Sequence, residues 1–211
     1  MMSKTLPLLL ITSALALAAC SGKSKDDVAS ASTTPANPAL AVPNGPPAVA
    51  NPTVGGVPMM ATRTIVDNAS AAPNLSTLVA AVKAADLVGT LSGPGPFTVF
   101  APTNDAFGRL APGMVDTLLK PENKASLTKV LTYHVVPGVV TADDLRRRIT
   151  AGGGTATLTT VEGDPITATL VGAVITLTDV NGNKSYVETA DVRQSNGIVH
   201  VVNGVIVPKL S

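Results

Sequence analysis

The sequence predicts an α+β domain with a largely antiparallel sheet or sandwich. Segments with the apolar spacing of helices come first, between residues 75 and 149. From residue 155 the pattern changes to period two and is rich in Thr, Val and Ile, which is typical of strands. One short apolar run at residues 97–100 adds an early strand. Helices followed by strands, without regular alternation, indicate the α+β class.

The first predicted helix follows Asn74, whose side chain can cap a free N–H of the first turn. Leu75, Leu78 and Val82 recur at helical spacing and give one apolar stripe. Gly89 is the predicted end of this helix. The Pro- and Gly-rich residues that follow predict a loop.

The block Phe97–Phe107 (FTVFAPTNDAF) contains all three phenylalanines of the chain. Its first four residues predict a strand, which Ala-Pro then ends. Thr103 is expected to cap a helix, and Asp105 would lie in the first turn, where negative charge suits the helix dipole. Phe107 then returns to the core.

Two more helices are predicted before the strands begin. Ala125–Val135 has one apolar face that includes His134, and a Pro-Gly pair ends it. Thr141 and Asp144 have the spacing of a capping box, which starts a short helix through about Ile149.

The second half of the domain predicts strands and turns. Tyr186 falls in one of these strands, where a core position is expected. Near the C-terminus, Ile198–Val202 and Val205–Val207 flank Asn203-Gly204, which predicts a β-hairpin with a type I′ turn. The predicted strands are Thr155–Val161, Ile166–Val171, Val174–Thr178, Tyr186–Val192 and Ile198–Val202.

The N-terminus predicts a bacterial lipoprotein. Residues 1–19 have the apolar run and small residues of a signal peptide, and the run is too short for a membrane span. The tetrapeptide ending at Cys20 resembles the lipobox, so the only cysteine of the chain is the expected lipidation site. Ser21, which follows it, favours the outer membrane over the inner membrane by analogy with enteric bacteria. The protein is therefore expected in the cell envelope, facing the periplasm or the surface.

Residues 20–61 form the predicted tether. After the lipidated cysteine they are rich in Pro, Ala, Ser and Asn and contain no aromatic residue, so the segment is expected to be disordered. Residues 62–211 are expected to form one domain with its own core. This domain carries equal numbers of basic and acidic side chains, which argues against nucleic acid as a partner.

The sequence predicts no enzyme, no metal site and no cofactor. It has no nucleophile motif, no Walker loop and no Rossmann fingerprint. Both histidines, His134 and His200, lie in apolar patterns and are expected to be buried with satisfied hydrogen bonds. The scarcity of aromatic residues argues against a site that stacks sugars or bases. The basic run Arg146–Arg148 is expected to be a solvated helix face, with contact to an anionic polysaccharide or headgroup as the alternative.

Three motifs together resemble the fasciclin domain family. Thr98–Phe107 and Gly197–Pro208 (GIVHVVNGVIVP) are similar to the first and second family boxes, and Tyr133–Gly138 is similar to the Tyr-His segment between them. The resemblance covers about residues 63–209. It implies a β-wedge or sandwich with helices at one edge, no cofactor, and adhesion through protein or glycan partners. In animal members the Tyr-His region is associated with integrin binding, so Tyr133 and His134 become candidate partner-binding residues.

The function predicted from these observations is binding without catalysis by a lipid-anchored envelope protein. One alternative is a carrier of small ligands or lipids, which requires an apolar cavity of several hundred Å³. A hydrolase is the other, and it requires an exposed histidine beside a carboxylate or serine in a cleft. Self-association of neighbouring domains also remains open.

Overall fold

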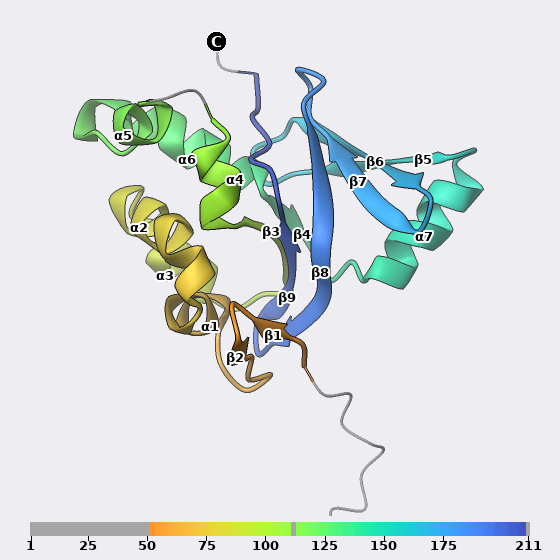
Figure 1. Ribbon diagram of the computed structural model, residues 1–211, viewed down its shortest axis with the longest axis horizontal. Coiled ribbons are helices and arrows are strands. Elements are labelled where there is room, and N and C mark those ends of the chain that lie inside the picture. Colours follow the sequence, from red (N-terminus) through yellow and green to blue (C-terminus); the bar gives the residue numbers. More distant parts are fainter. Residues whose placement is uncertain (1–50, 111–112, 210–211) are drawn as a thin grey trace, which may run out of the picture. The chain divides into compact units, whose positions relative to one another are not determined.

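The computed structural model describes residues 51–110 and 113–209. In these residues the α+β class and the fasciclin-like wedge predicted from the sequence are confirmed (Figure 1). The helices are α1 (Ile65–Ala71), α2 (Ser76–Ala84), α3 (Val88–Ser92), α4 (Asn104–Gly108), α5 (Met114–Leu118), α6 (Lys124–Tyr133) and α7 (Ala142–Ala151), with short 3-10 turns at Pro73–Leu75 and Pro121–Asn123. The strands are β1 (Thr53–Val54), β2 (Val57–Pro58), β3 (Phe97–Pro102), β4 (Val135–Pro137), β5 (Thr155–Thr159), β6 (Pro165–Val171), β7 (Val174–Thr178), β8 (Lys184–Gln194) and β9 (Gly197–Val202).

Strands β3 to β9 form one sheet in the order β4-β3-β9-β8-β7-β6-β5. Every neighbouring pair is antiparallel except β3 and β9, which run parallel in register from Phe97 opposite Gly197 to Pro102 opposite Val202. Strand β8 is long and irregular and serves both halves of the sheet. It pairs with β7 only through its first three residues and with β9 along the rest, with register shifts between.

The sheet curls until its two edges approach each other. The backbone N–H of Val161, just after β5, donates to the carbonyl of Val135 in β4 at 2.8 Å. This bond links the two outer strands and nearly closes the wedge.

Two apolar clusters fill the space on the two faces of the sheet. The helical core lies between the sheet and α1–α6, and the wedge core lies between the curled strands and α7 (Figure 1). Strands β3 and β9 contribute to both, because successive side chains point to opposite faces. Val99 and Val199 enter the helical core, whereas Phe100 and Val202 enter the wedge core.

Two of the three helix caps predicted from the sequence are confirmed. The Thr103 hydroxyl accepts a hydrogen bond from the Ala106 N–H at 3.3 Å at the start of α4. Thr141 and Asp144 form the capping box of α7, with the Asp144 N–H donating to the Thr141 hydroxyl at 3.1 Å. The pKa of Asp144 is lowered to about 2. The largest cause is the hydrogen bond from the side chain of Thr141, and the second is the hydrogen bond from the side chain of Arg147.

The predicted cap and end of the helix that follows Asn74 are wrong. Asn74 lies in a 3-10 turn and makes no capping bond, and the N–H of Thr77 donates to Asn104 Oδ1 at 3.0 Å instead. The cap of α2 thus comes from the first turn of α4. Gly89 does not end the helix either, since α2 stops at Ala84 and Gly89 lies inside the separate short helix α3.

The predicted C-terminal hairpin is also wrong. Asn203 extends the β8 ladder with main-chain and side-chain bonds to Tyr186, and the following residues form no strand. Their N–H groups donate to side chains: Ile206 to His134 Nε2 at 3.2 Å and Val207 to the Asp179 carboxylate at 2.9 Å. The β-hairpin forms earlier, where Ser195 and Asn196 connect β8 to β9.

Ordered structure begins before the predicted domain boundary at residue 62. Residues 51–60 contain the small hairpin β1–β2, and Val54 and Met59 are buried against the helical core. The Asn68 side chain donates to the carbonyl of Met60 at 2.7 Å and accepts from its N–H at 3.1 Å. The expected tether is therefore corrected at its C-terminal end. The signal peptide, Cys20 and the rest of the tether lie outside the described residues.

Replacing Phe107 by alanine should lower the free energy of unfolding by about 3–5 kcal/mol, because its ring is buried in the helical core. For a chain of this size the melting temperature should fall by roughly 6–20 °C. Thermal denaturation followed by circular dichroism measures the change. Tyr186→Ala is the control, since it also removes an aromatic ring, but one that is 39% exposed. Equal melting temperatures for the wild type and Phe107→Ala would remove Phe107 from the core.

Candidate functional site

The structure places the two candidate partner-binding residues in the interior. Tyr133 is 0% exposed and His134 is 2% exposed, at the junction between α6 and β4. The Tyr133 hydroxyl donates to the Pro165 carbonyl at 2.8 Å, and burial raises its pKa to about 12. Side chains this buried cannot touch a partner at the surface. The expected contact role of Tyr133 and His134 is therefore corrected to a structural one.

His134 ties the end of α6 to the C-terminal segment. Its Nδ1–H donates to the Val130 carbonyl at 2.7 Å, and its Nε2 accepts from the Ile206 N–H at 3.2 Å. The acceptor role of Nε2 requires a neutral ring. Burial, the largest effect, lowers the pKa of His134 to about 4, so the ring stays neutral near pH 7.

His200 has a corresponding role in β9 with the opposite tautomer. Its Nε2–H donates to the Val140 carbonyl at 2.8 Å, and its Nδ1 accepts from the Asp191 N–H at 3.3 Å. The ring stacks on Phe100 with 5.5 Å between centroids, and burial lowers its pKa. The hydrolase alternative requires an exposed histidine in a cleft, and neither histidine meets that requirement.

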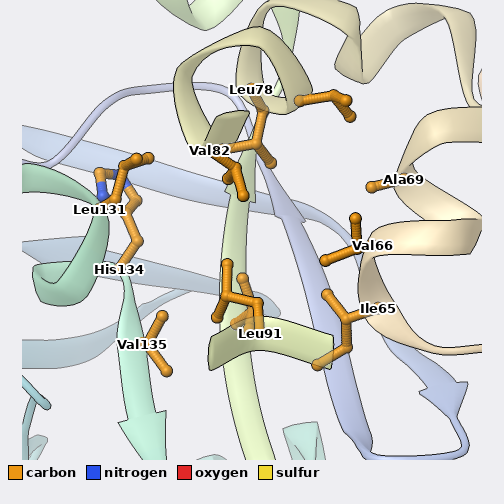
Figure 2. Close-up of a pocket in the computed structure, with 11 residues that line it drawn as sticks. Ile65, Val66, Ala69, Leu78, Val82, Leu91, Leu131, His134 and Val135 are labelled. Atoms are coloured by element: carbon orange, nitrogen blue, oxygen red, sulfur yellow. The ribbon is translucent and has the colours of Figure 1, made fainter. Parts of the chain in front are cut away.

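The apolar cavity beside His134 is too small for a lipid or other small ligand. Side chains from α1, α2, α3 and α6 line it, among them Ile65, Leu78 and Leu131 (Figure 2). Its volume is about 30 Å³, which is room for about one water molecule. Small-ligand sites occupy roughly 300–1,000 Å³. The carrier alternative therefore finds no support in this cavity.

Within residues 51–110 and 113–209, no group of three or more His, Cys, Asp or Glu side chains could hold a metal ion. None of the helices in these two ranges is long and apolar enough to cross a membrane.

A surface groove lies directly beyond the Tyr-His segment. The chain comes to the surface between the buried residues Val136 and Val140, and Val139 is 50% exposed at the groove wall. We call this site the proline groove, and its volume is about 560 Å³. The residues that line it are Pro94–Pro96, Val139, Thr141 and Arg193–Ile198.

Asparagine side chains hold the walls of the proline groove together. Asn196 Nδ2 donates to the carbonyls of Leu91 and Gly93 at 2.8 and 3.1 Å, and its Oδ1 accepts from the Ile65 N–H. The Asn51 side chain forms two hydrogen bonds with the backbone of Arg193, near the end of β8. Asn51 Nδ2 donates to the Arg193 carbonyl at 2.7 Å, and Asn51 Oδ1 accepts from the Arg193 N–H at 2.9 Å. The groove is thus preformed, which lowers the ordering entropy that a partner must offset.

Sequence reasoning missed the proline groove because its residues are far apart in the chain. Two local signals fell on it: the predicted loop that ends at Pro96, and Ser195-Asn196-Gly197, a turn sequence between two strand-like runs. Tyr186 was expected in the core and is exposed instead. It belongs to a second groove at the other end of β8.

The stability of the domain should fall as the pH is lowered from 6.5 to 4. In the unfolded chain a histidine takes up its proton near pH 6.5, whereas folded His134 resists protonation until about pH 4. The unfolded state then binds more protons, and stability decreases by roughly 3 kcal/mol over this range. Urea denaturation at several pH values, compared between the wild type and His134→Gln, measures this contribution.

Glutamine supplies a donor and an acceptor but does not titrate in this range, so its curve should fall less steeply. Burial also lowers the pKa of His200, so this residue makes stability fall at low pH as well. Because His200 is present in both proteins, it contributes to both curves. If the variant is too unstable to measure, an NMR titration of His134 in the wild type replaces the comparison. A wild-type curve no steeper than the variant's, or an NMR pKa near 6.5, would contradict the assignment.

Comparison with known proteins finds close relatives in bacteria. The chain is 48% identical over 151 residues to Protein sll1483 of Synechocystis, which covers 70% of this chain and 74% of the relative. It is 33% identical over 195 residues to the immunogenic protein MPB70 of Mycobacterium bovis, covering 81% of this chain and 90% of that protein.

The fold also matches a solved structure, a FAS1 domain pair from the insect cell adhesion molecule fasciclin I. The TM-score is 0.61 at 21% identity, and the match covers 74% of this chain and 52% of that two-domain chain. The family model described as "Fasciclin domain" matches residues 73–208. These residues span β3, β9 and the Tyr-His segment between them, so the chain belongs to the fasciclin domain family.

Proposed function

We propose that this protein is a lipid-anchored envelope protein whose fasciclin domain binds a protein partner through the proline groove. Fasciclin domain proteins act in adhesion and interaction, as the name of the insect adhesion molecule indicates. The observation that carries the proposal is the preformed groove next to the Tyr-His segment, at residues 94–96, 139, 141 and 193–198.

The chemistry of the proline groove suits a peptide segment or loop of a protein. Pro94, Pro96 and Val139 supply apolar surface, and Arg193 and Ser195 supply polar groups. An apolar centre with a polar rim is the usual composition of a protein interface. The buried histidines and the small internal cavity leave the outer surface as the place for function.

Anchoring would come from the lipid on Cys20, with the residues before Asn51 as the spacer. Diacyl modification provides stable attachment, where a single acyl chain would be marginal. The unpaired cysteine, the lipobox-like tetrapeptide and the preceding apolar run support this part of the proposal. An outer-membrane location is the favoured one.

Cys20→Ser should release the protein from membranes, because the thioether to the lipid can no longer form. Fractionation of cells followed by an alkaline wash of the membrane pellet measures the change. The wild type should stay in the pellet and the variant should appear in the soluble fraction. A variant that still pellets after the wash would contradict the lipid anchor, without bearing on the proline groove.

Val139→Arg should weaken binding of the full-length protein to its partner by about tenfold or more, since a charge would enter the apolar part of the groove. Binding of labelled protein to envelopes of the producing bacterium measures the effect. Val171→Arg is the matched control, because Val171 is 58% exposed on the β6–β7 hairpin and does not line the groove. Equal binding by the two variants would contradict the assignment of the surface. Sedimentation at several concentrations shows whether a second copy of the chain is the partner.

A further inference from the structure

A second surface groove lies at the opposite end of the β8–β9 hairpin from the proline groove. We call it the tyrosine groove. It lies between the end of α4, the start of β8 and the segment after β9, and its volume is about 280 Å³. The residues that matter here are Arg109, Asn183, Lys184, Tyr186 and Asn203. No lining residue is shared with the proline groove.

We propose that the tyrosine groove binds an acidic polysaccharide through the uronate class of sugar. The inference goes beyond the proposed function, because it assigns a second ligand to a separate surface. Three features of the groove support the proposal: two cations without an ionic partner, an exposed aromatic ring, and amide groups with unused hydrogen-bonding capacity.

The cations are Arg109 and Lys184, which line the groove together with no acidic side chain in its walls. Neither forms a salt bridge within the described residues. Arg109 Nη1 donates to the Asn203 carbonyl at 3.1 Å, which holds the guanidinium in place and leaves other N–H groups for a ligand. Guanidinium and carboxylate groups form strong charge-assisted hydrogen bonds, so the groove selects an anion.

The aromatic ring belongs to Tyr186, the one exposed aromatic side chain among the described residues. Two backbone bonds to Asn203 fix its position: its N–H donates to Asn203 Oδ1 at 2.9 Å, and its carbonyl accepts from the Asn203 N–H at 3.1 Å. Lys184 lies two residues away on the same face of β8. The exposed Tyr186 ring and the exposed Lys184 side chain are therefore on the same side of the strand, and the ring offers apolar surface to a pyranose.

The amides favour a hydroxyl-rich ligand over a simple anion. Within the described residues, Asn203 Nδ2 donates to no protein group and Asn183 Oδ1 accepts from none. A donor and an acceptor lie near the same cations, and sugar hydroxyls both donate and accept.

Asp179 forms hydrogen bonds to residues that line the groove, but its carboxylate is buried. Both of its oxygens accept bonds from Asn183 and neighbouring backbone N–H groups. Glu188 lies further along β8 and does not line the groove.

The groove is rigid before any ligand binds. Besides the bonds to Asn203, the buried Ser185 hydroxyl donates to the Gly204 carbonyl at 2.9 Å and accepts from the Gly204 N–H at 3.1 Å. A Cβ at Gly204 would lie 3.2 Å from the Ser185 side chain, so glycine permits this close approach. A preformed site loses less conformational entropy on binding.

The test measures binding of oligogalacturonate to the full-length protein by calorimetry at low ionic strength. The wild type should bind, and more salt should weaken binding because charge carries part of it. Arg109→Gln, Lys184→Gln and Tyr186→Ala should each weaken binding by about tenfold. The matched controls are Arg63→Gln and Lys129→Gln, exposed cations before α1 and on α6 that do not line the groove, which should bind like the wild type. Melting temperatures confirm that every variant is folded.

Two further probes separate the sugar from other anions. A neutral dextran oligosaccharide should not bind, and poly-glutamate should bind less tightly than the uronate and without dependence on Tyr186. The proposal is overturned if oligogalacturonate does not bind, if Tyr186→Ala binds it like the wild type, or if poly-glutamate binds equally well. These outcomes leave the proline groove untouched, because Val139→Arg tests that surface separately.

Discussion

The parallel pair β3 and β9 is the interaction on which the rest of the structure depends. The two strands occupy the middle of the sheet and are buried on both faces, so their side chains build the helical core and the wedge core at once. The pair begins at Phe97 and Gly197, where a Cβ on Gly197 would clash with the Phe97 carbonyl oxygen. Close approach at this point sets the register of the whole pair.

Burial on both faces means that every polar group in these strands needs a partner inside the protein. Leaving such a group unpaired costs about 1–3 kcal/mol. The Thr98 hydroxyl donates to the Gly138 carbonyl at 2.7 Å and accepts from the Val140 N–H at 2.8 Å. His200 bonds Val140 and Asp191 in the same way. Thr98 and His200 are thus cross-links between segments that are far apart in the chain.

An interior of this kind leaves function to the surface, and the surface is shaped where β8 and β9 end. At one end, the turn through Asn196 joins α3 and the Pro94–Pro96 loop to make the proline groove. At the other end, Asn203 joins α4 to Tyr186 and makes the tyrosine groove. In both cases a single asparagine connects three segments. The β8–β9 hairpin thus carries a different groove at each end, and these are the two binding surfaces proposed above.

The sequence alone determined the elements whose signals are local. Thr103 and the Thr141–Asp144 pair cap their helices as predicted, because a cap joins residues three positions apart. The apolar patterns also placed Phe107 and both histidines in the core. Tertiary structure alone decided the cap of α2 by Asn104, the parallel pairing of β3 with β9, the burial of Tyr133 and the exposure of Tyr186. It also created both grooves. These features depend on contacts between segments that are far apart in the chain. The spacing of residues within one segment cannot predict which other segment it will contact in the folded core.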